Sequence, residues 1–180
     1  MLTSLLLPVL LSGVALFFAS FLSWMVLQLH KQDWVKLEKE DEVIATLRSV
    51  EVPNGNFMIP GCVDMAEMKS EEYTKKYEEG PRAVLTVFAN VGMGRNLALT
   101  FVYFLIVSFC LAYLAQLHIP AGADFMTVFR FVATAGLMTF LAAIVQHAIW
   151  FHNRIVGHIV ESVLYAAIVA AIFGAMWPAA

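Results

Sequence analysis

Two histidines and a glutamate could form a chemically active layer near the C-terminal end of the chain. His147 precedes Asn153, and His158 and Glu161 follow it, within apolar stretches that must form a helical hairpin. With a rise of 1.5 Å per residue, all three side chains should lie on the order of 8–12 Å inside the turn. His158 and Glu161 are spaced i,i+3 and therefore share a helix face.

Several chemistries suit such a layer. Imidazole and carboxylate groups can bind a divalent metal ion or relay protons. Two histidines on facing helices can also ligate a haem. In the simplest alternative these groups satisfy one another and the backbone of the turn. His30 and His152, near helix ends, are expected at the membrane interface. A di-metal enzyme is disfavoured because the paired E-x-x-H signature is absent.

Arg130 and Gln146 are further polar side chains within apolar stretches. Ionisable groups inside a membrane are costly, so each is a functional hypothesis. Arg130 lies one to two turns inside its helix and can extend outward to water. It can also contact Gln116, Tyr113 or a lipid phosphate. Gln146 adjoins His147.

The composition defines the kind of elements that must position these groups. Hydrophobic residues make up 61% of the 180 residues and charged residues 14%, and the mean hydropathy is +0.76. Soluble domains carry about 25% charged residues. The composition therefore excludes a soluble enzyme domain, a disordered tail and a disulfide scaffold, and indicates a membrane protein.

The charges separate the chain into spans and one polar segment. We predict an all-α membrane protein with four transmembrane helices and a mixed cytoplasmic segment between helices 1 and 2. The predicted helices cover residues 4–28, 97–118, 125–150 and 158–177. The predicted organisation is transmembrane helix 1 over 1–30, a cytoplasmic segment over 31–95, and helices 2–4 over 96–180. The first helix is expected to be an uncleaved span rather than a signal peptide.

The basic residues predict the orientation of these helices. Nine Lys and Arg residues lie in 31–95, one (Arg154) lies in the third link, and none lies in 118–124 or after the fourth helix. Cytoplasmic loops are enriched in Lys and Arg. We therefore expect residues 31–95 in the cytoplasm and both termini outside.

Local patterns within 31–95 predict a few short elements. Helices are expected over 37–49 and 71–79, with Ser70 as a cap of the second. Residues 52–61, with two prolines and two glycines, should form a turn-rich loop with short extended pieces. Residues 83–91 favour a strand or a segment lying along the membrane.

Several functions and sites are disfavoured. The charge of 31–95 is mixed and slightly acidic, unlike the basic patch of a nucleic-acid-binding protein. The run Gly92–Asn96 lacks the spacing of a phosphate-binding loop. Cys62 and Cys110 have no zinc-binding spacing, and a disulfide between them is not expected.

A set of short motifs in the polar segment suggests relatives. They are Asp33-Trp-Val-Lys-Leu, Asp41-Glu, Leu47-Arg, Gly80-Pro81 and Met93-Gly-Arg-Asn-Leu97. This pattern resembles uncharacterised small bacterial inner-membrane proteins. The resemblance implies a bacterial inner-membrane location and this layout, and no activity.

The leading functional interpretation is a non-enzymatic structural or accessory subunit without a cofactor. Rows of small residues, such as Ala166, Ala170 and Gly174, allow close helix packing within the chain or between copies. The expected partners are the lipid bilayer, further copies or other membrane subunits. The alternatives are a metal- or haem-binding protein using His147, His158 and Glu161, and a small oligomeric channel or transporter.

Overall fold

The computed structural model describes residues 3–89 and 92–180 and contains two compact units. The first, which we call the bundle, combines the N-terminal residues through Val35 with Met93–Ala180. The second, the inserted unit, is Lys36–Gly92. Each is described by itself.

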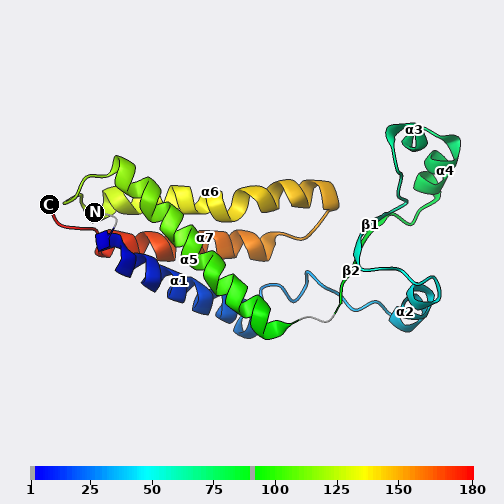
Figure 1. Cartoon of the computed structure of the whole chain (residues 1–180), viewed down its shortest axis with the longest axis horizontal. Helices are drawn as coiled ribbons and strands as arrows, with labels where there is room; N and C mark the ends of the chain where they lie inside the picture. The colour runs from blue at the N-terminus through cyan, green and yellow to red at the C-terminus, as the bar shows by residue number, and fades with distance from the viewer. Residues whose placement is uncertain (1–2, 90–91) are drawn as a thin grey trace. The chain divides into compact units, whose positions relative to one another are not determined.

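The bundle contains four helices long and apolar enough to cross a membrane (Figure 1). The first spans Thr3–Val26 and consists of η1 (Thr3–Leu5), α1 (Leu6–Phe21) and the π-helix η2 (Leu22–Val26). The others are α5 (Met93–His118), α6 (Phe125–Phe151) and α7 (Val156–Ala175). The chain is 68% helical, and the predicted all-α membrane fold with four transmembrane helices is confirmed.

The four helices close into a ring of contacts. Helix α1 packs against α5 and α7, and α6 packs against α7 and α5. Figure 1 shows α6 and α7 running side by side from the turn that joins them. Fully buried side chains, among them Leu16, Leu111, Val132, Val169 and Phe173, fill the interior. The outward faces carry exposed apolar side chains, as suits helices surrounded by lipid.

Small residues bring α6 and α7 close together. A Cβ atom added to Gly136 would lie 3.3 Å from the Cα atom of Ala166. Ala166 and Ala170 are buried inside the bundle. Two of the predicted small residues therefore serve packing within the chain, where close backbone approach allows extensive van der Waals contact.

The C-terminal residues fasten the end of the bundle where α5 and α6 are linked. The Trp177 indole donates a hydrogen bond of 2.8 Å to the carbonyl of Pro120. The amide of Gly122 donates one of 2.8 Å to the carbonyl of Pro178. Gly122 has a φ of +78°, a conformation that favours glycine.

The inserted unit consists of short elements. They are α2 (Glu40–Ser49), β1 (Gly55–Ile59), α3 (Met65–Met68), α4 (Glu71–Glu79) and β2 (Ala83–Val87). The strands form an antiparallel pair with Gly55 opposite Val87. Ser70 caps α4 as predicted, accepting a hydrogen bond of 3.1 Å from the Tyr73 amide. The strand expected over 83–91 ends at Val87, and residues 90–91 lie outside the described residues.

Candidate metal centre

An irregular stretch of backbone at the end of the first span turns the chain back toward α7. In the π-helix η2 the ordinary α-helical ladder is lost, and the amide of Leu29 bonds to the carbonyl of Ser23 at 3.1 Å. Gln28 has a φ of +50°, which is uncommon for a residue other than glycine. Such π-helical segments occur frequently at functional sites. The turn places His30 against the start of the last helix.

His30 is buried, with 4% of its surface exposed. Its ring stacks on Trp24, with centroids 4.0 Å apart and planes 16° from parallel. Its other neighbour is Gly157 in the first turn of α7, where an added Cβ would lie 2.9 Å from the His30 Cε1 atom. His30 is therefore buried inside the protein, because the chain folds back and the absent side chain of Gly157 leaves room for the ring. That His30 lies at the level of the membrane interface stays a prediction.

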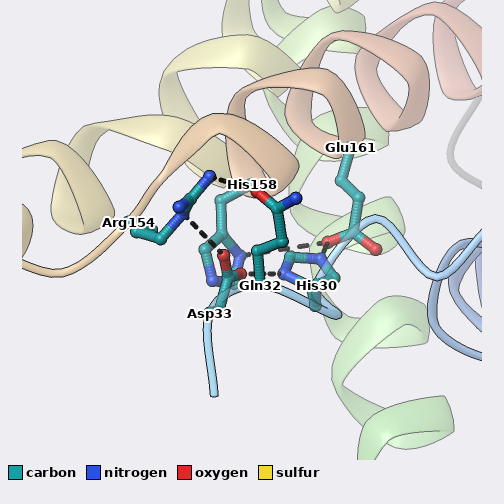
Figure 2. A network of polar contacts seen from close by, with 6 residues as sticks. All are labelled: His30, Gln32, Asp33, Arg154, His158 and Glu161. Atoms are coloured by element: carbon teal, nitrogen blue, oxygen red, sulfur yellow. Dashed lines mark hydrogen bonds and ion pairs between the residues drawn. The ribbon is translucent and has the colours of Figure 1, made fainter. Parts of the chain in front are cut away.

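His30, His158 and Glu161 form a cluster that joins the turn after the first span to α7 (Figure 2). His30 Nε2 lies 3.1 Å from Glu161 Oε2, and His158 Nδ1 lies 3.9 Å from the same oxygen. One ligand atom from each residue lies within 4.8 Å of the others. The side chains of His30 and Glu161 are 2% and 7% exposed, and that of His158 is 32% exposed.

A second group of polar side chains lies on the Nδ1 side of the His30 ring, away from Glu161. Asp33 Oδ2 lies 2.6 Å from His30 Nδ1, in hydrogen-bonding geometry. The Arg154 guanidinium donates a hydrogen bond of 2.7 Å to Gln32 Oε1, and its Nε lies 3.9 Å from Asp33 Oδ1 (Figure 2). A carboxylate that accepts from the outer nitrogen of a histidine fixes its tautomer and orientation in many metal sites.

The hydrogen bond between Asp33 and His30 Nδ1 determines whether the other ring nitrogen, Nε2, carries a proton or a lone pair. With the proton of a neutral imidazole on Nδ1, the Nε2 atom carries a lone pair. Nε2 then faces a carboxylate oxygen at 3.1 Å, although the pair lacks the geometry of a hydrogen bond. Glu161 Oε1 is also buried without a hydrogen-bond partner. An unprotonated histidine nitrogen and a carboxylate oxygen this close require a proton or a cation between them.

The structure brings together two of the three predicted ligands. His158 and Glu161 meet within the cluster, and His30 replaces His147 as their neighbour. His147 is exposed on α6, with its ring 4.5 Å from that of Phe151, and lines a separate pocket together with His158. The predicted grouping of His147 with His158 and Glu161 is corrected. Residues at the same depth on neighbouring helices need not point toward each other.

The other predicted polar residues lie outside the cluster. Arg130 and Gln146 are exposed on α6, and Arg130 forms no ion pair with any residue that the structure describes. That Arg130 extends toward the membrane surface stays a prediction. His152 is exposed and ends α6 in a left-handed conformation, with a φ of +53°.

The sequence predicted an interfacial position for His30 rather than a place among the ligands, and it gave no sign of Asp33 as its partner. Their i,i+3 spacing permits the contact between them within one turn. Their approach to α7, however, depends on the backbone path between Val26 and His30, which no local pattern encodes.

Comparisons of the chain with protein-family models, curated proteins and solved structures find no match.

Proposed function

We propose that the chain is a metal-dependent multi-pass membrane protein that holds a divalent transition-metal ion between His30, His158 and Glu161. The observation that carries this proposal is that His30 Nε2 and Glu161 Oε1 are buried without a hydrogen-bond partner, while His30 Nε2 and Glu161 Oε2 lie 3.1 Å apart. A cation between them would remove their repulsion and neutralise a buried carboxylate, which is expensive to leave unpaired.

The spacing of the ligand atoms suits a small ion. Bonds of about 2.0 Å at tetrahedral angles put neighbouring zinc ligands about 3.3 Å apart. The distances to Glu161 Oε2, 3.1 Å from His30 and 3.9 Å from His158, bracket that value. Two histidines and one carboxylate leave a coordination position open, as in catalytic rather than structural zinc sites.

The same geometry favours a single ion over a haem. The rings of His30 and His158 have centroids 4.4 Å apart and planes inclined by 50°. Rings this close leave no room for a porphyrin between them. His147, the other candidate axial ligand, lies outside the cluster.

Metal analysis of the purified full-length protein tests the proposal. After reconstitution with Zn²⁺ and removal of loose ions, we expect about one zinc per chain by elemental analysis. Substitution with Co²⁺ should give the visible absorption of a low-symmetry site. His30→Ala and Glu161→Gln should each abolish stoichiometric binding, because each removes a ligand.

His147→Ala is the matched control, since it removes a histidine at the same end of the bundle that is not one of the three ligands. It should retain full zinc binding. Absence of zinc, iron and other transition metals from the wild-type protein after reconstitution would contradict the proposal. A proton between His30 Nε2 and Glu161 Oε2 would then account for their short distance. Equal loss of zinc in His147→Ala would contradict the ligand assignment.

A second property, association with other subunits, is favoured by the inserted unit. None of its described residues is buried, and Val63 is 93% exposed. Exposed apolar surface of this kind suits a contact surface for a partner. We therefore also propose an accessory role in a homo- or hetero-oligomeric membrane complex. Native mass measurement in mild detergent tests it, and a strictly monomeric protein that co-purifies with nothing would count against it.

We also propose a location in the bacterial inner membrane, with the inserted unit in the cytoplasm. The proposal rests on the nine basic residues between the first two spans and on the resemblance of the polar motifs. Cys62, in the inserted unit, provides the test. A membrane-impermeant thiol reagent should label Cys62 in inverted vesicles and leave it unmodified in intact cells. Labelling in intact cells with equal efficiency would reverse the orientation.

A further inference from the structure

A pocket lies between the joined ends of α6 and α7, beside the candidate metal centre. Its volume is about 410 Å³. Four polar side chains line it, those of His147, Asn153, Arg154 and His158. Ala143, Ile144 and Ile155 form its apolar walls.

The pocket lining combines hydrogen-bond donors with an absence of carboxylates. Arg154 carries a permanent positive charge and five N–H groups. One of them is bonded to Gln32, and Nε lies 3.9 Å from Asp33 Oδ1, which leaves the remaining N–H groups for a ligand. The amide of Asn153 and the imidazoles of His147 and His158 can each donate as well. No aspartate or glutamate is among the lining residues, so the lining favours an anion.

The backbone at the pocket adds to this preference. Helix α7 begins at Val156, and its N-cap residue, Ile155, provides no side-chain hydrogen bond to the first turn. The N-terminus of a long helix carries partial positive charge and unpaired amides. The lining of the pocket thus includes the start of α7 together with the arginine.

The pocket lies at the ends of two candidate spans, where the phosphate groups of a bilayer are expected. Part of its lining belongs to spans, through Ala143 and His147 in α6 and His158 in α7, and part belongs to the link that contains Arg154. Basic pockets between transmembrane helices at this level bind anionic lipid headgroups in other proteins.

We propose that this pocket binds the phosphate group of an anionic ligand, supplied either by a lipid headgroup or by a soluble phosphate ester. Arg154 and His147 hold the phosphate oxygens, and the apolar walls contact the carbon chain next to the phosphate. The site goes beyond the metal centre and does not need a bound metal ion.

Two binding assays on chelator-treated full-length protein distinguish the sources. In the first, native mass spectrometry compares retention of phosphatidylglycerol with that of phosphatidylcholine. In the second, calorimetry follows titration with glycerol 3-phosphate, with glycerol as the blank. Preferential retention of phosphatidylglycerol identifies a lipid headgroup, and saturable binding of glycerol 3-phosphate identifies a soluble ester. Either result supports the proposal.

Paired variants assign the binding to this pocket. Arg154→Gln and His147→Ala should each weaken it by about tenfold, since each removes a donor to a charged group. Arg130→Gln, which removes an exposed arginine elsewhere on α6, should leave it unchanged. Absence of binding in both assays, or equal weakening in Arg130→Gln, would overturn the proposal.

The metal proposal can fail separately. Glu161→Gln should abolish zinc binding without weakening phosphate binding, and His147→Ala should do the reverse. Loss of phosphate binding in Glu161→Gln would overturn the independence of the pocket.

Discussion

Asp33 illustrates how a residue outside the cluster can control its chemistry. It touches neither His158 nor Glu161 in any contact that the structure describes, yet it bonds to the outer nitrogen of His30 at 2.6 Å. The carboxylate therefore holds the His30 ring in the orientation that turns Nε2 toward the cluster.

Replacing this carboxylate by an amide should weaken zinc binding without abolishing it. In Asp33→Asn we expect a loss of about 10–100-fold in zinc affinity with an unchanged stoichiometry at saturation. Competition with a chromophoric chelator measures the affinity. Asp41→Asn, an exposed aspartate in α2, is the control. An affinity unchanged from the wild-type value would show that Asp33 does not act on His30 as a ligand.

The start of α7 provides a test at the scale of an element. Alanine usually replaces glycine within a helix with a gain of about 1 kcal/mol. At Gly157 the new methyl group would lie 2.9 Å from His30 Cε1 and 3.1 Å from the carbonyl oxygen of Leu29. Displacing a packed ring and backbone costs about 1–3 kcal/mol. Gly157→Ala should therefore lower the free energy of unfolding and weaken zinc binding.

Gly94→Ala is the matched control for this substitution. Gly94 is also the second residue of its helix, α5, and nothing lies within 4 Å of an added Cβ. Its free energy of unfolding should remain unchanged or rise. Denaturation in detergent micelles, followed by circular dichroism, compares the two variants. Equal stability of Gly157→Ala and Gly94→Ala would disprove the close packing of His30 on α7.

The start of α6 should show a defined pH dependence. Asp124 caps this helix, and its Oδ2 accepts a hydrogen bond of 2.6 Å from the Thr127 hydroxyl. This hydrogen bond is the main cause that lowers the pKa of Asp124 below its usual 3.8. Because the folded-state pKa is depressed, the cap stabilises α6 above pH 3.8 and loses its contribution as the pH falls through the lowered value.

Carbon-detected NMR titration of the Asp124 carboxyl group measures this effect. In Thr127→Val the pKa should rise toward 3.8, since the hydroxyl donor is lost. Thr74 in α4 has a hydroxyl that donates to the carbonyl of the N-cap residue Ser70, and Thr74→Val should leave the pKa of Asp124 unchanged. A Thr127→Val midpoint equal to that of the wild type would contradict the assignment.

At the scale of the whole molecule, the two units should differ in stability. The bundle has a continuous buried core, whereas every described residue of the inserted unit is at least partly exposed. Local opening costs least where few apolar contacts are buried. Amides of α2 should exchange with deuterium much faster than those of α7 in the isolated protein. Comparable protection in both helices would show that the inserted unit is held by contacts absent from this structure.

The sequence predicts the bundle well because every backbone polar group in lipid must find its hydrogen-bond partner within the same segment. Long stretches free of charge, such as Phe131–Phe151, must be helical, and their lengths and links determine the hairpins. The candidate site is predicted only in part. His158 and Glu161 lie on one helix at a spacing that local geometry explains. His30 joins them only because the chain turns at Gln28 and finds space at Gly157, which is a property of the assembled fold.

The cluster also has a consequence for the biogenesis of the protein. Gln32 and Arg154, which bond beside it, are separated by 122 residues in the chain. His30 emerges from the ribosome with the first span, and His158 and Glu161 emerge with the last. The complete ligand set therefore cannot exist until the final helix has been synthesised and has docked against the first. A nascent or C-terminally truncated chain presents His30 without its partners, so loading of the proposed metal ion would belong to the last stage of assembly.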